Sequence, residues 1–348
     1  MKRNPNLSVF ISATDVLPTS VFDDIFIAVM KMLYSNITYR CDCRCVFCAA
    51  DNGINRYNTD VPLEKLEEAL EKLGIGPGDE VIINGGEPTM HPQFPEIIRV
   101  CRNRNPRIVL FTNGNYFSIA KEKDVISHIE GVDQIEVPIY TLDPELDEKL
   151  TRRKGNLKSR LEGIKALADA SREKQYQLKI KMLLLKSNEN DLYEIFDGTL
   201  KLLKHFDMAA ISFPIYSHAM FKRFETLSPD IDSLGRKISD SIIFLIEHGI
   251  LLKLLRIPLC LLPVSVAEIY VKQLTGNPIL VPGFKYAYLD PVKFITDIDL
   301  SDAPYYNCRC DFKPECKFGE SCCGVPVDYI NIFGWPDCVN PIRSDFLR

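Results

Sequence analysis

The stretch Ile37-Thr-Tyr-Arg-Cys41-Asp-Cys43-Arg-Cys45-Val-Phe-Cys48 gathers cysteines in a short loop that follows a strand-like run. Three of them, Cys41, Cys45 and Cys48, follow the spacing C-x3-C-x2-C. Thiolates are the usual ligands of iron–sulfur clusters, and a [4Fe–4S] cube has four irons to satisfy. Three local cysteines leave one iron open, which suits a site that binds a substrate or cofactor there. We therefore expect a [4Fe–4S] cluster on these three thiolates, with Cys43 pointing away from it.

Zinc and disulfides are the alternative explanations for this loop. Zinc sites favour paired C-x2-C units whose partner pair lies a dozen or more residues away. A fourth ligand from Cys43 would make the loop too crowded for a usual zinc site. Cysteines so close in sequence cannot easily satisfy disulfide geometry among themselves. The spacing therefore favours the iron–sulfur cluster.

The cysteine spacing, together with the aromatic Phe47, resembles the radical S-adenosylmethionine (radical SAM) superfamily. The resemblance implies that the open iron chelates the amino and carboxylate groups of S-adenosylmethionine. A second motif, Gly85-Gly86-Glu87, directly follows a strand-like run and is similar to the glycine-glycine-glutamate motif of that family. By this resemblance Gly85 and Gly86 line the methionine moiety of the cofactor. Glu87 would help to bind the cofactor, through its side chain or by holding the turn. The alternative is that the two glycines form only a turn, since a glycine pair after a strand is on its own usually a turn.

Asn113 follows the next strand-like run, in the sequence Thr112-Asn113-Gly114. It is either part of a turn, to which Asn-Gly supplies left-handed backbone geometry, or a cofactor contact. The following strand-like run departs from the family, in which it often ends in a serine-containing turn. Tyr140 or Thr141 would take that polar role here.

Two further contacts with the cofactor are implied by the resemblance. Arg152 or Arg153 occupies the region where members of the family place a basic residue near the cofactor's carboxylate, and an arginine fork suits a carboxylate. Asn188 resembles the polar residue that contacts the ribose. Alternatively, Asn188 caps a helix ahead of Asp191.

The fold class follows from the alternation of patterns between Leu33 and Ile257. Strand-like and helix-like runs alternate there in about six units, which predicts βαβ units and a parallel sheet. A complete (β/α)8 barrel needs about 250 residues, so we expect an α/β fold with a partial (β/α)6 TIM-like barrel, the architecture that the resemblance also implies. In such folds the functional loops lie at the carboxyl ends of the strands, where the motifs above are found. The expected domains are an N-terminal segment (1–32), the barrel (33–257) and a cysteine-rich extension (258–348).

The extension is defined by its cysteines. Six of the 12 cysteines of the chain lie in its last forty or so residues: Cys308, Cys310, Cys316, Cys322, Cys323 and Cys338. Cys260 lies earlier, in a turn bounded by Pro258 and Pro263. Cys101, by contrast, lies on the apolar side of an expected helix and is assigned to the core.

The cysteine-rich tail resembles the SPASM and twitch extensions of radical SAM enzymes, which bind auxiliary [4Fe–4S] clusters. The match is partial, because the seven-cysteine SPASM pattern is absent. By this resemblance the ligands of one auxiliary cluster are Cys260, Cys310, Cys316 and Cys322, with Cys308 and Cys323 as substitutes. A structural zinc is the alternative, since four thiolates satisfy a tetrahedral zinc site.

Composition restricts the possible partners and location. A net charge of −5 argues against a broad nucleic-acid-binding surface. The dense basic run Lys149–Arg160 is more typical of a solvated helix start. No secretory signal is visible, and the apolar runs are too short and too broken by charge to span a bilayer. These features predict a cytoplasmic metalloprotein whose cysteines bind metal, with no membrane partner and nucleic acid unlikely as a partner.

The activity that the resemblance implies is reductive cleavage of S-adenosylmethionine to a 5′-deoxyadenosyl radical, which abstracts a hydrogen from the substrate. The favoured substrate is a ribosomally made peptide that is oxidised, crosslinked or epimerised. The alternatives are a small metabolite such as an antibiotic or cofactor precursor, an RNA, or a scaffold without catalysis. A reductase such as flavodoxin or ferredoxin would supply the electron. The sequence identifies neither the substrate nor a catalytic acid or base.

Overall fold

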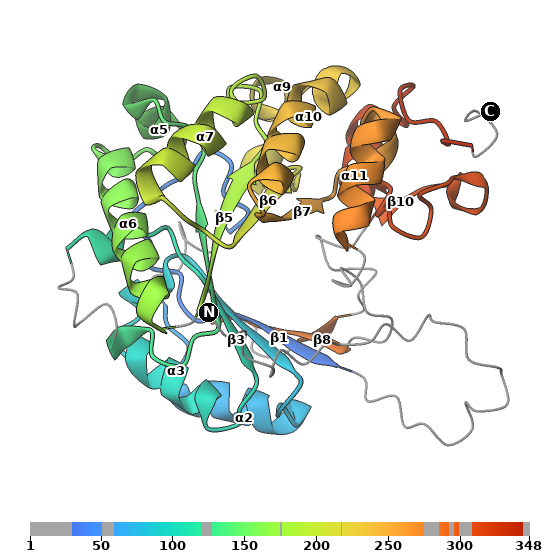
Figure 1. Cartoon of the computed structure of the whole chain (residues 1–348). Coiled ribbons are helices and arrows are strands. Elements are labelled where there is room, and N and C mark those ends of the chain that lie inside the picture. The colour runs from blue at the N-terminus through green and yellow to red at the C-terminus, as the bar shows by residue number, and fades with distance from the viewer. Residues whose placement is uncertain are drawn as a thin grey trace, which may run out of the picture.

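A curved sheet of parallel strands forms the body of the protein in the computed structural model (Figure 1). The structure describes residues 30–50, 59–119, 127–174, 176–216, 218–274, 285–291, 296–298 and 308–343. Within these residues the sheet has nine strands, in the order β7-β6-β5-β4-β3-β2-β1-β8-β9. The strands are β1 (Lys31–Asn36), β2 (Glu80–Asn84), β3 (Arg107–Phe111), β4 (Gln134–Pro138), β5 (Gln177–Leu183), β6 (Met208–Ser212), β7 (Leu251–Leu255), β8 (Lys285–Leu289) and β9 (Thr296–Ile298).

The first eight strands pair in parallel, and only β9 is antiparallel to its neighbour. The central strands are runs of buried residues, such as Ile180 and Leu110, because helices cover the outer face and side chains fill the inner one. The sheet order leaves β7 and β9 as its two edges, so the barrel is incomplete. This confirms the expected α/β fold with a partial TIM-like barrel.

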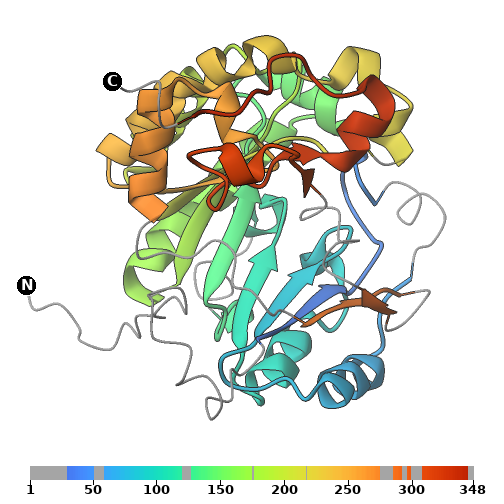
Figure 2. The ribbon, with the colours of Figure 1, turned by 90° about the vertical axis from the view of Figure 1, so that its right-hand side faces the viewer.

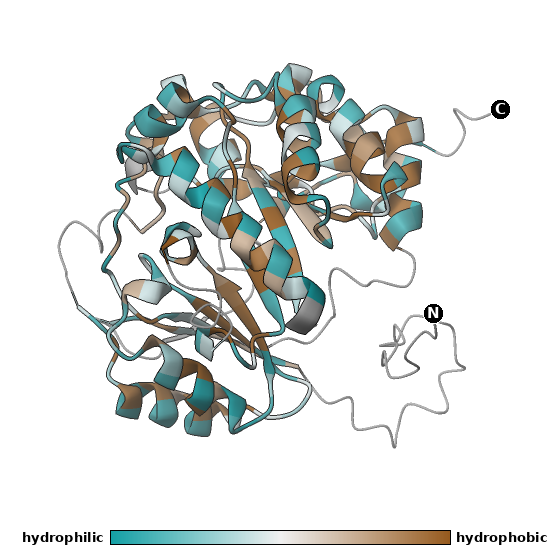
Figure 3. Cartoon of the chain, turned by 60° about the vertical axis from the view of Figure 1, so that its left-hand side comes forward, coloured by the Kyte–Doolittle hydropathy of each residue, from teal (hydrophilic) through white to brown (hydrophobic). Residues whose placement is uncertain are grey.

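Helices between successive strands cover the outer face of the sheet (Figures 1 and 3). They turn their apolar side to the strands, as α2 shows with Leu66, Ala69 and Leu70 buried at helical spacing. Gly74 ends this helix in the left-handed conformation, with φ 59°. The helices of the barrel are α2 (Leu63–Leu73), α3 (Phe94–Arg102), α5 (Pro144–Thr151), α6 (Asn156–Lys174), α7 (Leu192–Leu203), α8 (His218–Phe221), α9 (Phe224–Leu227), α10 (Ile231–Glu247) and α11 (Val264–Leu274).

The residues after 258 contribute to two parts of the structure. β8 and β9 extend the barrel sheet beside β1. The cysteine-rich tail forms β10 (Cys308–Arg309), the 3-10 turn η6 (Lys313–Glu315), β11 (Val325–Pro326) and α12 (Val327–Phe333). In Figure 2 this tail lies across the upper part of the barrel.

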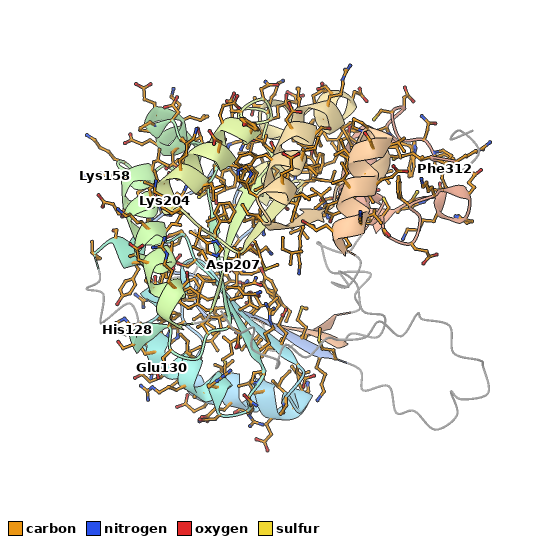
Figure 4. The ribbon with its side chains drawn as sticks, viewed as in Figure 1. His128, Glu130, Lys158, Lys204, Asp207 and Phe312 are labelled. Atoms are coloured by element: carbon orange, nitrogen blue, oxygen red, sulfur yellow. The ribbon has the colours of Figure 1, made fainter. Side chains whose placement is uncertain are left out.

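One aspartate of the tail ties it to the barrel. The Asp328 carboxylate accepts a hydrogen bond of 2.8 Å from the backbone N–H of Tyr216, which follows β6, and it forms an ion pair with Arg256, which follows β7. Phe312, labelled in Figure 4, packs edge-on against Trp335 within the tail, with ring centroids 5.9 Å apart. The tail therefore lies against the carboxyl ends of β6 and β7.

The structure shows where Cys101 and the basic run of Lys149–Arg160 lie. Cys101 is fully buried in the core, as expected. In the basic run, Lys158 points outward from α6 (Figure 4) and its side chain is 84% exposed. Among the described residues, no helix is both long and apolar enough to cross a membrane.

Candidate active site

A cleft of ≈ 260 Å³ opens at the carboxyl ends of the strands. The cysteine loop after β1, the glycine loop after β2 and the turn after β3 all contribute to its wall. The predicted residues that line it are Cys41, Cys45, Phe47, Cys48, Gly85, Gly86, Glu87, Asn113 and Tyr140. Segments far apart in sequence thus meet in one cavity, as the positions of the motifs predicted.

The cysteine loop is anchored by its backbone to the end of α5. The N–H of Arg44 donates to the carbonyl of Thr151 at 2.9 Å, and that of Val46 donates to Leu150 at 2.8 Å. The carbonyl of Val46 in turn accepts a hydrogen bond from the Arg223 guanidinium at 3.0 Å. These contacts hold the loop from both sides while Cys41, Cys45 and Cys48 stay partly exposed at the cleft.

Cys43 points into a buried polar network behind the loop. Its thiol donates to Asn156 Oδ1 at 3.3 Å and accepts from Asn115 Nδ2 at 3.6 Å, and the residue is 3% exposed. The Cys43 side chain is also hydrogen-bonded to those of Cys41 and Cys45, and these bonds raise the pKa of the Cys41 and Cys45 thiols. The predicted role of Cys43 as a residue that points away from the cluster stays a prediction.

The fit of the three thiols to a cluster can be tested on this geometry. As the described side chains lie, no group of three or more His, Cys, Asp or Glu residues could hold a metal ion. A [4Fe–4S] cube makes a different demand, because each iron takes its own thiolate. Cys41, Cys45 and Cys48 line the wide cleft together with Cys43, so four thiols are available there to ligate irons. The residues therefore fit a thiolate-bound cube, and the choice of three ligands among them stays a prediction.

An aromatic and cationic stack borders the cleft on the side of β4. The rings of Phe47 and Tyr140 meet edge-on with centroids 4.7 Å apart, and the Arg160 guanidinium lies 4.8 Å from the centre of the Tyr140 ring. Arg160 is 1% exposed and bonds Asp147, itself fully buried, at 2.8 Å. A buried guanidinium with a single carboxylate partner adds positive charge beside the thiols.

The predicted contact of Arg152 or Arg153 with the cofactor stays a prediction, and a further arginine that was not predicted, Arg160, lines the cleft. Arg152 is exposed and ends α5 with φ 53°, and Arg153 forms an ion pair of 3.2 Å with Asp42. Neither residue lines the cleft, whereas Arg160 does. The sequence contained a signal for it, since Arg160 closes the basic run and lies on the same face of α6 as the buried Ile164.

Gly85 and Gly86 allow the loop after β2 to contact the start of the cysteine loop. A Cβ atom at Gly86 would lie 2.3 Å from the carbonyl oxygen of Arg40, and one at Gly85 would lie 2.4 Å from that of Thr38. Gly85 also has φ 148°. Hydrogen bonds of 2.7 Å from Gly86 N to Thr38 O and from Glu87 N to Arg40 O close the contact. The close approach that requires glycine here is therefore between two backbone segments.

Glu87 links the ends of β2 and β3. Its buried carboxylate accepts hydrogen bonds from the hydroxyls of Thr89 at 2.7 Å and Thr112 at 2.6 Å, and from the N–H of Asn113 at 2.6 Å. Burial raises the pKa of Glu87 to about 7 in spite of these bonds. Of the two predicted roles, these contacts match the holding of the turn.

Asn113 and Asn188 differ in what their amides contact. The Asn113 side chain lies at the cleft and donates to Asp42 Oδ1 at 2.6 Å. Asn188 is 1% exposed, and its amide group bonds the backbone of Leu185, Tyr140 and Leu183 at 2.8–2.9 Å. It does not cap α7, whose first flanking residue is Asp191. The ribose contact predicted for Asn188 stays a prediction.

A second, smaller cavity lies within the tail. The four predicted auxiliary ligands all line it: Cys260, Cys310, Cys316 and Cys322. The backbone N–H of Leu259 donates to Cys322 Sγ at 3.2 Å. The pKa of the Cys260 thiol is raised to about 12, mainly by burial and to a smaller extent by the electrostatic effect of the nearby Cys322, Cys310 and Cys316. Hydrogen bonds from Cys323 and from backbone N–H groups instead lower the pKa of the Cys322 thiol to about 6. The cavity measures only ≈ 10 Å³, so a cube would require the thiols to separate.

The other tail cysteines lie outside that cavity. Cys308 and Cys323 are hydrogen-bonded to each other, which lowers the pKa of Cys308. Cys338 instead interacts with Asp232 at the start of α10. Cys323 is also hydrogen-bonded to Cys322, so one of the two substitutes lies directly beside a preferred ligand, and the choice of auxiliary ligands stays a prediction.

The barrel is similar in sequence to known proteins. Residues 35–197 match the family described as the Radical SAM superfamily. The probable GTP 3′,8-cyclase of Methanococcus aeolicus is 30% identical over 182 residues, which are 50% of this chain and 56% of that protein. The chain is therefore similar to radical SAM proteins over residues 35–197. The family implies a [4Fe–4S] cluster and S-adenosylmethionine as cofactors.

Solved structures share the fold. SuiB of Streptococcus suis bound to S-adenosylmethionine has a TM-score of 0.56 and 15% identity, covering 91% of this chain and 77% of that one. The complex of SuiB with the precursor peptide SuiA has the same TM-score and identity and covers 91% and 75%. The chain spans about half the length of the curated relatives that it matches.

Proposed function

We propose that this enzyme cleaves S-adenosylmethionine reductively and uses the 5′-deoxyadenosyl radical to abstract a hydrogen from its substrate. The observation that carries the proposal is that Cys41, Cys45 and Cys48 border the same cleft as the Gly85–Glu87 loop. When bound, the cluster and S-adenosylmethionine supply the radical chemistry. The residues of the chain bind, orient and shield these groups.

Each wall of the cleft has a role in this proposal. The three thiolates hold the cluster, with one iron left for the amino and carboxylate groups of the cofactor. The Gly85–Glu87 loop and Asn113 lie beside the cofactor's methionine moiety. Arg160, at the cleft with its charge buried, is the cation that faces its carboxylate. Phe47 and Tyr140 exclude water on the side of β4.

The tail is proposed to hold a second [4Fe–4S] cluster on Cys260, Cys310, Cys316 and Cys322, as SPASM and twitch extensions do. Its support is the enclosed cavity that these four thiols share. Such a cluster would accept an electron from the substrate radical or ligate the substrate. A reductase such as flavodoxin or ferredoxin would reduce the first cluster, and the cytoplasm is the proposed location.

We favour a ribosomally made peptide as the substrate, modified by oxidation, crosslinking or epimerisation. The support is the likeness in fold to SuiB, which was solved with a precursor peptide. The second candidate is a small metabolite such as a cofactor precursor. Several curated relatives favour it, because they are named as GTP 3′,8-cyclases or probable GTP 3′,8-cyclases.

The test measures 5′-deoxyadenosine from anaerobically reconstituted enzyme, S-adenosylmethionine and dithionite. The wild type is expected to form it. The variant with Cys41, Cys45 and Cys48 all changed to Ala is expected to form none, while Cys101→Ala, which alters a buried core thiol, serves as the control. Formation at the wild-type rate by the triple variant would refute the proposed site.

A further inference from the structure

The wall of the cleft beyond β5 includes the segment that leaves the end of β6. Phe213, Pro214 and Ile215 of this segment line the cleft. Sheet-like hydrogen bonding holds the chain as far as Phe213, whose N–H donates to the carbonyl of Leu255 in β7 at 2.9 Å. Pro214 has no N–H with which to continue this pairing. The position of the residues that follow therefore depends on contacts outside the sheet.

Two side chains hold backbone groups of this segment. Arg256, which follows β7, donates from its guanidinium to the carbonyl of Pro214 at 3.3 Å. Asp328, near the start of α12 in the tail, accepts a hydrogen bond of 2.8 Å from the N–H of Tyr216. The two side chains also form an ion pair with each other. A carboxylate of the tail thus reaches the segment after β6 both directly and through Arg256.

Aromatic rings make a second contact between the tail and this segment. The ring of Phe213 meets that of Tyr329 edge-on, with centroids 5.7 Å apart. The ring of Tyr216 lies 6.1 Å from that of Tyr329 and meets that of Phe333 edge-on at 5.7 Å. Tyr329 and Phe333 belong to α12, the same short helix that contains Asp328. This helix therefore packs along the segment from Phe213 to Tyr216.

Arg256 combines a strained backbone with a buried charge. Its φ is 64°, in the left-handed region that residues other than glycine seldom adopt. Its side chain is fully buried, where a charge is costly unless it is paired. Features of this kind persist where the surrounding structure requires them, and they cluster at functional sites. The ion pair of Arg256 with Asp328 is therefore placed to fix the wall of the cleft.

The tail acts on the cleft from behind this wall. Among the described residues, none of the tail lines the cleft. Asp328 follows Cys322, a proposed ligand of the tail, with only a short turn and β11 between them. The place of Asp328 therefore depends on the folded form of the tail.

We propose that Asp328 is a positioning residue for the cleft. Together with Arg256 it holds the wall of Phe213, Pro214 and Ile215 in place for S-adenosylmethionine, so the tail supports the binding site without contacting the ligand. The inference rests on the proposed function, because S-adenosylmethionine is the ligand proposed for this cleft. The physical basis is preorganisation, since a wall that is already held need not be ordered when the ligand binds.

The first measurement is hydrogen exchange in the reconstituted full-length protein without ligand, read by mass spectrometry of peptides that contain Tyr216. In Asp328→Ala the N–H of Tyr216 loses a charged acceptor, so it should exchange on the order of tenfold faster. The N–H of Lys317, which donates to the carbonyl of Ile342 elsewhere in the tail, should keep its protection. Equally faster exchange at both sites would mean that the whole tail has loosened, which contradicts a positioning role.

The second measurement is calorimetric binding of S-adenosylmethionine without reductant, so that no cleavage occurs. Asp328→Ala should bind it about two- to thirtyfold more weakly, the range for a residue that acts on a ligand site without touching the ligand. Asp328→Asn, which keeps an oxygen that can accept the hydrogen bond from Tyr216, should lose less. Asp328→Ala combined with Arg256→Met should bind no more weakly than the weaker single variant, because both changes remove the same support.

The matched control is Asp337→Ala, which removes an exposed carboxylate from the same tail and should bind like the wild type. Unchanged affinity in Asp328→Ala, or an equal loss in Asp337→Ala, would overturn the inference. Losses that simply add in the double variant would overturn it as well. Failure of the wild type to bind S-adenosylmethionine would instead refute the proposed function, so the two failures are distinguishable.

Discussion

The two cysteine-rich regions of this protein surround their cavities in opposite ways. The loop after β1 presents its thiols to a wide cleft, whereas the tail closes four thiols around a small cavity with apolar walls such as Phe318 and Val339. A network of polar side chains lies behind the loop, whereas backbone turns lie behind the tail cavity. The difference teaches that an open cluster site needs a rigid rear wall as well as its ligands, because one side must stay free for the cofactor.

The largest effect that tests this difference is expected at the glycine loop. In Gly86→Ala, the added methyl would meet the Arg40 carbonyl at 2.3 Å and displace the start of the cysteine loop. A misplacement of about 1 Å can lower a rate on the order of 100-fold. We therefore expect a loss of that size in 5′-deoxyadenosine formation, and a lower iron content in the loop.

The control for this prediction is Gly76→Ala, since a Cβ at Gly76 meets nothing within 4 Å. Equal rates for Gly86→Ala and the wild type would show that this close contact is not needed. Intact iron with weakened cofactor binding would instead indicate that Gly86 acts on the ligand directly.

The tail can be tested by its metal content. Wild-type enzyme should carry about eight irons, four for each cube, and Cys260→Ala should lose roughly half of them. Cys338→Ala, which alters a thiol outside the tail cavity, should lose none. One zinc per chain in the wild type, with about four irons that all depend on the loop cysteines, would favour the structural zinc site.

The rear wall of the loop can be weakened without touching a thiol. Arg160→Met leaves Asp147 buried without its ion pair, and breaking a buried pair costs about 3–5 kcal/mol. We expect a drop of that order in the free energy of unfolding, measured with denaturant, together with weaker binding of S-adenosylmethionine. Lys158→Met removes an exposed charge from the same helix and should change neither.

The smallest effect is expected below the cleft, at Lys253. Lys179 and Arg107 oppose its charge and Glu80 and Glu136 favour it, but burial dominates and lowers its pKa to about 8. Since the free side chain has a pKa of about 10.4, the unfolded chain binds more protons between about pH 8 and 10, and stability rises with pH there. Lys253→Met should therefore be more stable at pH 7, by about 1–2 kcal/mol.

That gain should shrink as the pH rises through 8 towards 10, because the wild-type lysine then becomes neutral in the folded state. The measurement is the unfolding free energy of both proteins across this range. A gain that does not change with pH would mean that the charge of Lys253 is not the cause.

The features that the sequence predicted are those that local patterns carry. The cysteine spacing, the Gly85–Glu87 motif and the alternation of strands and helices located the cleft and the partial barrel. Cys260 was grouped with the tail cysteines, and the structure brings it to the same cavity as Cys310.

The features that escaped prediction depend on tertiary contacts. Helical spacing places Arg160 on the buried face of α6, but only the fold shows that this face packs toward the turn after β3 and brings Arg160 to the cleft. The contact of Gly85 and Gly86 with the backbone at Thr38 and Arg40 likewise joins segments that are far apart in sequence.

The central claim is that the loop after β1, and not the tail, binds S-adenosylmethionine at an open iron. It is tested by electron paramagnetic resonance of the reduced enzyme, with and without S-adenosylmethionine. In a variant with Cys260, Cys310, Cys316 and Cys322 changed to Ala, the remaining cluster signal should shift when the cofactor is added. In the Cys41, Cys45 and Cys48 triple Ala variant, the remaining signal should not respond. A shift in the triple variant, or none in the tail variant, would contradict the account.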